Sequence, residues 1–208
     1  MFYLKQPKEI YKNSFAIIKH EADLSRFNEQ EQEIAIRLIH SSGMVDIVDD
    51  LVFFGDAVAR GREALNKNAP IICDVKMAAK GIIKRKFTTK NEILCALDND
   101  GVNEFALENK ITRSAAGIEM LKHRIDGAII AIGNAPTSLF HLLELMKNDN
   151  IRPALILGFA VGFVGAVESK QALIEQNFGV PFITLKGRRG GSAFAAAAIN
   201  ALAFGLST

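Results

Sequence analysis

A chain of 208 residues, 49% of them hydrophobic, is long enough to bury the core of one domain. A formal net charge of +2 is too small for a general nucleic-acid binder, which would usually be more basic. No apolar run approaches the roughly 20 residues that a membrane span needs, and the N-terminus lacks the apolar core of a signal peptide. We therefore expect a cytoplasmic protein with neither a nucleic-acid nor a membrane partner.

Two amphipathic helices are predicted at the N-terminus. Apolar residues recur at helical spacing over residues 7–25, and Ser14 falls within their arc. Ser14 either bonds back to a carbonyl one turn earlier or points into a pocket. The second predicted helix spans 28–43, where Asn28 and Glu31 resemble a capping box.

His40 lies in the last turn of the second helix, just before two serines and Gly43, a glycine typical of helix ends. One interpretation is a histidine that interacts with the helix C-terminus. The other is an acid–base group presented at a helix end. The pattern alone leaves both open.

After residue 50, short apolar runs alternate with helical patterns. This alternation predicts βαβ units and one α/β domain over 1–208, with a doubly wound, mainly parallel sheet and helices on both faces. The N-terminal helices should pack outside the sheet or across a partner. Cys73 and Cys95 lie in strand-like runs and should be buried and reduced. The expected strands are 51–54, 70–75, 93–97, 128–132, 154–157 and 181–185; the expected helices are 57–66, 77–83, 102–107, 114–125, 136–146 and 193–206, with another following the loop that begins at 158.

The central unit of this pattern is 127–146. An unbroken apolar run at 128–132 indicates a strand buried on both faces, and Pro136 suits the first turn of the helix that follows. Open α/β sheets place ligands at the carboxyl ends of their strands. We expect free N–H groups at this helix start to favour an anionic ligand.

Three glycine-rich loops follow successive strands, at 133–137, 158–170 and 186–192. Glycine lets backbone approach a ligand closely, and adjacent amides and cations attract anions. Together the loops predict a wide, electropositive pocket for a polyanion, although Arg188 and Arg189 could equally be a solvated surface pair. The candidate substrate-binding residues in these loops are Asn134, Thr137, Lys170 and Arg188.

A nucleotide site is the obvious alternative. The glycines at 158, 162 and 165 loosely resemble a dinucleotide loop, and cations after the next strand would favour NADP. However, only one further βα unit follows this loop. The motifs GxxxxGK[ST], HExxH and CxxC are absent, so we expect no cofactor and no metal.

Seven long segments occur in order along nearly the whole chain. They are SFAIIKHEADLSRF (14–27), RLIHSSGMVD (37–46), PIICDVKMAAKG (70–81), TRSAAG (112–117), AIGNAPTSLFHLLE (131–144), ILGFAVGFVGAVESK (156–170) and GVPFITLKGRRGGSA (179–193). In these segments the chain resembles the precorrin-8X methylmutases of cobalamin biosynthesis, including the cobalt-precorrin-8 methylmutases of the anaerobic route.

The resemblance implies a flavodoxin-like fold, a homodimer and an isomerase that uses no redox cofactor. Such enzymes move a methyl group from C11 to C12 of a corrinoid ring, giving hydrogenobyrinic acid or its cobalt form. By resemblance, His40 is the catalytic histidine, Ser14 contacts substrate, and Arg113 belongs to the pocket rather than capping the corner 112–114. An Ala-rich stretch, 193–203, could add close helix packing to the dimer.

The chemistry agrees with this resemblance. The methyl shift rearranges ring double bonds, so a proton must be placed or removed at the macrocycle, and histidine suits both near neutral pH. The acetate and propionate arms of the ring require an electropositive container, and a large flat ligand suits a dimer interface. An NADP-dependent oxidoreductase and a non-catalytic corrinoid carrier are the alternatives.

Overall fold

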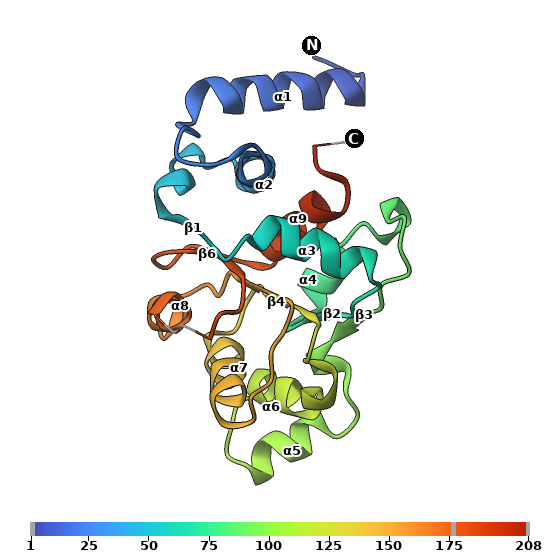
Figure 1. Cartoon of the computed structure of the whole chain (residues 1–208), viewed down its shortest axis with the longest axis vertical. Helices are drawn as coiled ribbons and strands as arrows, with labels where there is room; N and C mark the ends of the chain where they lie inside the picture. Colours follow the sequence, from blue (N-terminus) through green and yellow to red (C-terminus); the bar gives the residue numbers. More distant parts are fainter. Residues whose placement is uncertain (1–2, 176–177, 207–208) are drawn as a thin grey trace.

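A six-stranded sheet divides the molecule into two helical layers (Figure 1). The computed structural model describes residues 3–175 and 178–206. The strand order is β1-β6-β5-β4-β2-β3, in which β1 is antiparallel to β6 and the other neighbouring pairs are parallel. The predicted mainly parallel α/β sheet is therefore confirmed. The strands are β1 Leu51–Phe54, β2 Ile71–Cys73, β3 Ile93–Cys95, β4 Ile129–Ile132, β5 Leu155–Gly158 and β6 Phe182–Leu185.

Helices connect the strands as the alternating pattern predicted, with small differences at their ends. The first ends at Glu21 rather than near residue 25, because Asp23 accepts a hydrogen bond from the backbone N–H of Ser25 in a tight turn. The predicted helix 114–125 is divided into an α-helix and a 3-10 turn. The described helices are α1 Pro7–Glu21, α2 Glu29–Ser42, α3 Ala57–Asn66, α4 Lys76–Gly81, α5 Val102–Glu108, α6 Arg113–Met120, α7 Pro136–Asn148, α8 Ala166–Glu175 and α9 Ser192–Phe204, with 3-10 turns η1 Val45–Asp50, η2 Lys84–Lys86, η3 Ala96–Asp98 and η4 Lys122–Arg124.

Both ends of α2 are determined by local sequence. The Asn28 side chain accepts hydrogen bonds from the N–H groups of Gln30 and Glu31, and Glu31 accepts one from the Asn28 N–H. At the other end Gly43 adopts a left-handed conformation with φ of 70°, which glycine tolerates without steric cost. These caps confirm the predicted helix and place His40 in its final turn.

The sheet separates two apolar cores. On one face, Ile129 and Ala131 of β4 share a core with α3, α4 and α9, and α2 lies above α9. On the other, Ile130 and Ile132 share a core with α6, α7 and α8. All four β4 residues are buried, as the unbroken apolar run predicted. The two outward-facing layers therefore carry α2 and α6 on opposite sides of the sheet (Figure 1).

The alanines of α9 serve the core of one protomer. Ala195, Ala198 and Ala201 are fully buried, and α9 packs against α2, α3 and α4. These buried side chains bring α2 close to the sheet, and the suggested contribution of this stretch to a dimer stays a prediction.

Helix α1 is the outermost element and packs on α2 (Figure 1). Phe15 and Ile18 are buried beneath it, whereas Ile10 and Ile17 are 42% and 55% exposed. The expected position outside the sheet is confirmed, but Ile10 and Ile17 of α1 are only partly covered in the protomer.

The two cysteines are free and buried on neighbouring strands, as predicted. Burial raises the pKa of the Cys73 thiol strongly, so it behaves as an inert core group. Among the described helices, none is both long and apolar enough to cross a bilayer.

Candidate active site

His40 is held by the crossing of α1 over α2. Its Nδ1 lies 2.8 Å from Ser14 Oγ, and the rings of Tyr11 and Phe15 lie 5.2 and 5.3 Å from the imidazole, measured between centroids. Ser14 therefore bonds to the histidine rather than back to its own helix. The back-bonded arrangement is therefore not the one adopted here, and the substrate contact of Ser14 stays a prediction.

The surroundings of His40 favour its neutral form. Partial burial, and then the positive charge of Arg37 one turn earlier, lower the pKa of His40 below its ordinary value. Arg37 is itself buried, stacks near Tyr11 and Phe15, and donates its Nε hydrogen to the Gly205 carbonyl. Near neutral pH the ring is thus mostly uncharged, and its protonated form is a stronger acid than an ordinary imidazolium.

The Ser14 contact also bears on which ring nitrogen carries the proton. If the Ser14 hydroxyl donates to Nδ1, the neutral ring carries its proton on Nε2. Within residues 3–175 and 178–206, no protein group hydrogen-bonds to Nε2. His40 is therefore fixed through one nitrogen and available for proton transfer through the other.

The three glycine-rich loops meet at the carboxyl edge of the sheet, as predicted. The Val161 N–H donates to the Asn134 carbonyl at 3.3 Å, and the Gly162 N–H donates to the Arg188 carbonyl at 3.2 Å. A Cβ at Gly190 would lie 2.3 Å from the Phe159 carbonyl oxygen, so only glycine permits this approach. The loops form one continuous surface, on which Asn134 and Arg188 are exposed.

The turn after β4 is already occupied by a carboxylate. Asp74, which is fully buried directly after β2, accepts hydrogen bonds from the N–H groups of Gly133, Asn134 and Ala135 at 2.8–2.9 Å. The expectation that amides at this helix start are free for an anionic ligand is therefore wrong for these three. Sequence reasoning missed Asp74, although an aspartate placed directly after a buried strand was a usable signal.

Two opposing effects act on the pKa of Asp74. Burial is the larger effect and raises the pKa of Asp74 above its ordinary value, while the three backbone donors, which favour the charged form, reduce that rise. Both carboxylate oxygens accept hydrogen bonds, an arrangement that suits the ionised group. Asp74 thus acts as a built-in anion that holds the turn before α7.

We predict that Asp74→Asn destabilises the fold by about 1–3 kcal/mol, because the amide NH₂ would face buried N–H donors and leave at least one unsatisfied. Urea unfolding measures this. Asp98→Asn is the matched control, because Asp98 is exposed and paired with Lys76. This substitution should lower the free energy of unfolding by less than about 1 kcal/mol. Equal stability of wild type and Asp74→Asn would mean that desolvation of the carboxylate cancels its hydrogen bonds.

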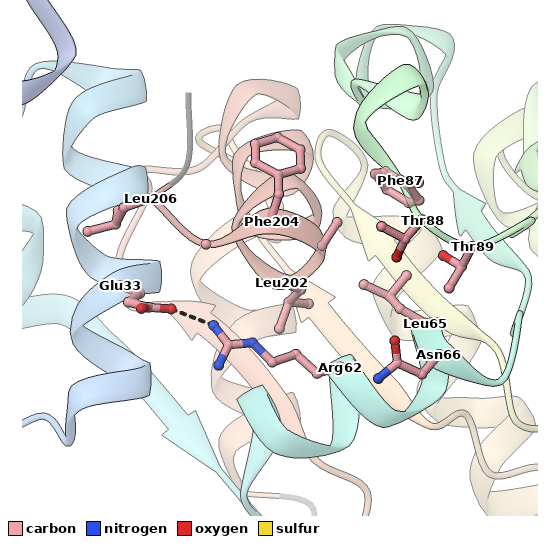
Figure 2. Close-up of a pocket in the computed structure, with 12 residues that line it drawn as sticks. Glu33, Arg62, Leu65, Asn66, Phe87, Thr88, Thr89, Leu202, Phe204 and Leu206 are labelled. Atoms are coloured by element: carbon pink, nitrogen blue, oxygen red, sulfur yellow. Dashed lines mark hydrogen bonds and ion pairs between the residues drawn. The ribbon is translucent and has the colours of Figure 1, made fainter. Parts of the chain in front are cut away.

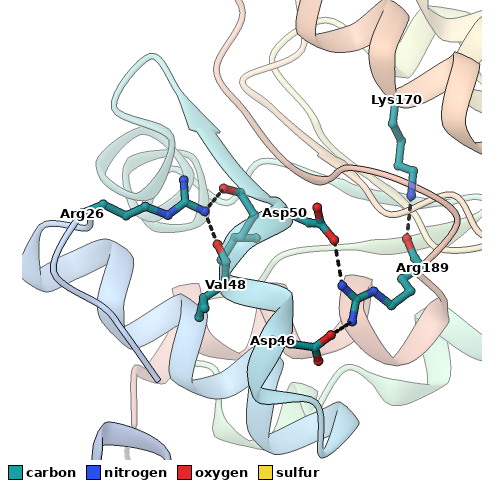
Figure 3. A network of polar contacts seen from close by, with 7 residues as sticks. Arg26, Asp46, Val48, Asp50, Lys170 and Arg189 are labelled. Carbon is teal, nitrogen blue, oxygen red and sulfur yellow. Dashed lines mark hydrogen bonds and ion pairs between the residues drawn. The ribbon is translucent and has the colours of Figure 1, made fainter. Parts of the chain in front are cut away.

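The basic residues of the loops differ in what they can reach (Figure 3). Lys170 is fully buried on α8 and donates to the Arg189 carbonyl at 2.5 Å, so its amine faces the underside of the loop. Arg189 is paired with Asp46 and Asp50 of η1, at 2.6 and 2.7 Å. Arg188 is exposed and lies over the Phe163 ring. The predicted substrate contact of Lys170 thus requires a conformation other than this one, whereas that of Arg188 does not.

Burial lowers the pKa of Lys170 to about 8, against an ordinary value of 10.5. Between these pH values the unfolded chain binds more protons than the native one, so the free energy of unfolding should rise with pH. We predict that wild type gains on the order of 2–3 kcal/mol relative to Lys170→Met as pH rises from about 8 to 10.5. Urea unfolding of both proteins at several pH values tests this, because other titrating groups cancel in the difference. A difference that does not change with pH would contradict it.

Arg113 and Thr137 form a second group, away from His40. The hydroxyls of Thr112 and Thr137 lie 2.8 Å apart and join the starts of α6 and α7. Arg113, the first residue of α6, is exposed beside them. One protomer therefore places His40 and Ser14 on one side of the sheet and Arg113 and Thr137 on the other, with the loop surface at the sheet edge between the two layers.

The sequence and the fold agree with one family of known proteins. The sequence profile of precorrin-8X methylmutase matches residues 9–204. The chain belongs to the precorrin-8X methylmutase family. It is 47% identical over 201 residues to the precorrin-8X methylmutase of a Sinorhizobium species, covering 97% of this chain and 96% of that protein. It is 37% identical to the cobalt-precorrin-8 methylmutase of Methanocaldococcus jannaschii, covering 94% and 89%.

A solved structure extends this agreement to the fold. The precorrin-8X methylmutase of Thermus thermophilus superposes with a TM-score of 0.85 at 36% identity, covering 94% of each chain. The family expected from the seven sequence segments is confirmed, and with it the class of enzyme, an isomerase of cobalamin biosynthesis.

Proposed function

We propose that this protein moves a methyl group from C11 to C12 of precorrin-8, or of its cobalt form, with His40 as the proton donor and acceptor. Family membership supports the reaction. The observation that carries the role of His40 is its pairing with Ser14, which anchors Nδ1 and leaves Nε2 without a protein partner among the described residues.

Substrate and product of this reaction are isomers, so each proton that His40 gives to the macrocycle must be recovered within the same turnover. A neutral imidazole of lowered pKa suits such a cycle, because once protonated it releases its proton readily. Ser14 keeps the ring from rotating as the proton moves. The histidine thus contributes orientation as well as proton transfer.

The carboxylate arms of the corrinoid need separate contacts. Arg188 and Asn134 are exposed on the loop surface, and Arg113 and Thr137 at the starts of α6 and α7. We assign these four to binding of the arms. Lys170 stabilises this surface indirectly, because its amine donates a hydrogen bond to the Arg189 carbonyl of the third loop.

Single-turnover absorbance spectroscopy with precorrin-8 or cobalt-precorrin-8 tests the proposed reaction, because isomerisation changes the conjugated system and hence the colour. We expect conversion without added NADP. Tight binding with an unchanged spectrum would instead identify a corrinoid carrier.

We predict that His40→Ala loses about 10²–10⁴-fold in turnover, the usual contribution of general acid–base catalysis. Its affinity for the corrinoid should largely persist, because the proposed carboxylate contacts lie elsewhere. The measurement is the rate of spectral conversion beside the dissociation constant, on protein shown to be folded by circular dichroism. His20→Ala, which removes an exposed histidine of α1, is the matched control. Near-wild-type conversion by His40→Ala would exclude His40 from catalysis.

We propose further that the protein is a homodimer whose subunits meet along α1. Ile10 and Ile17 leave an apolar strip on α1 that α2 does not cover. A partner subunit could also bring its Arg113 toward the His40 side, since a single protomer keeps these residues on opposite sides of the sheet.

Sedimentation equilibrium tests the dimer. We expect wild type at twice the chain mass of 22.7 kDa, and the double variant Ile10→Asp/Ile17→Asp near the chain mass, because charges cannot be buried cheaply at an apolar interface. Leu107→Asp, at an exposed leucine of α5, should remain dimeric. A monomeric wild type at micromolar concentration would contradict the proposal.

Mixing His40→Ala and Arg113→Ala chains, under conditions in which neither variant alone shows turnover, tests whether a site is shared. If His40 and Arg113 of different subunits build each site, dimers mixed from His40→Ala and Arg113→Ala chains should recover roughly a quarter of wild-type activity, since half the dimers are mixed and each has one intact site. No recovery would mean that each subunit builds its own site.

A further inference from the structure

The feature that the proposed reaction leaves unexplained is the clamp formed by Arg189 with Lys170, Asp46 and Asp50 (Figure 3). The guanidinium of Arg189 bonds to both aspartates, and its carbonyl accepts from Lys170. One loop residue is therefore held through its side chain by η1 and through its backbone by α8. Additional backbone bonds join the same segments, since the Lys186 N–H donates to the Asp50 carbonyl at 2.9 Å.

The clamp lies between the two features assigned to the active site. On one side, η1 begins at Val45, two residues after the Gly43 cap that ends the His40 helix. On the other side, Arg189 is the direct neighbour of Arg188. A cavity of about 240 Å³ lies between the end of the His40 helix and the loops. Its lining includes Met44, Phe163, Arg188 and Arg189.

The charges of the clamp are already paired within the protein. Two carboxylates face the one guanidinium of Arg189, so it offers little net attraction to a further anion. Arg188 has no carboxylate partner among the described residues, and its guanidinium lies 5.4 Å from the centre of the exposed Phe163 ring. Arg189 therefore holds the loop through its ion pairs, and the neighbouring Arg188 is available to bind an anionic ligand.

We infer that Arg189 is a positioning residue, which fixes the loop so that Arg188 meets a carboxylate arm of the corrinoid at the correct place relative to the His40 helix. This inference rests on the proposed function. It assigns no substrate contact to Arg189 itself, so its effect on binding must act through Arg188.

Equilibrium dialysis with hydrogenobyrinic acid, the coloured product, measures binding without turnover. Arg188→Met should raise the dissociation constant roughly tenfold or more, the usual effect of losing a charged hydrogen bond. Arg189→Met should raise it to a similar extent, and the double variant no further than Arg188→Met alone. The dissociation constant of Arg189→Lys should lie between those of wild type and Arg189→Met, because one ammonium cannot bond to both aspartates as the guanidinium fork does.

The matched control is Arg62→Met. Arg62 of α3 is paired with Glu33 of α2 at 2.5 Å, and its side chain is 31% exposed, against 34% for Arg189 (Figure 2). It too joins two elements across the surface, but away from the loops. A purely structural role for Arg189 would make both variants shift the urea midpoint alike and leave both dissociation constants unchanged.

The outcomes separate the inference from the function on which it rests. If wild type does not bind the product, the proposed function fails. If wild type and Arg189→Met bind it equally, only the inference fails. If the losses of the two single variants multiply in the double variant, Arg189 acts independently of Arg188, which also overturns the inference.

Discussion

The carboxylate of Asp74 is the interaction on which the candidate site depends most directly. It accepts the N–H groups of three consecutive residues after β4, in a position from which water is excluded. Unpaired, those amides would be costly at a buried strand end, and the carboxylate would be equally costly without them. Each therefore requires the other, and together they hold the turn that carries Asn134.

Backbone hydrogen bonds link that turn to the other two loops along the carboxyl edge of the sheet. The Asn134 carbonyl accepts a hydrogen bond from the second loop, at Val161, and the backbone of Gly162 continues the contact to Arg188. Gly190 completes the surface, because only a residue without a Cβ fits against the Phe159 carbonyl. The surface is built chiefly from backbone, which explains why glycine recurs in all three loops.

The electrostatics of the site divide into two zones. Around His40, aromatic rings and the buried guanidinium of Arg37 favour a neutral imidazole, which suits reversible proton transfer. The loops present positive charge, but less of it than their composition indicates, because Arg189 is paired with two aspartates and Lys170 is buried. The carboxylate arms of a corrinoid would thus bind to the few loop cations that are not already paired, while the reacting part of the ring contacts the neutral imidazole of His40.

The sequence alone determined the features that arise between residues close in the chain. The capping box at Asn28, the glycine stop at Gly43 and the buried strand at 128–132 follow from local hydrogen bonding, backbone freedom and apolar patterning, and the seven family segments identified the methylmutase family. Only the tertiary structure decided which distant groups meet. Ser14 and His40 are 26 residues apart, Asp74 lies about 60 residues before the amides it binds, and Arg189 reaches back 139 residues to Asp50. Such partners depend on the order of the strands and on how α1 crosses α2. For the same reason, the sequence could list the cations of the loops but could not show which of them were already neutralised.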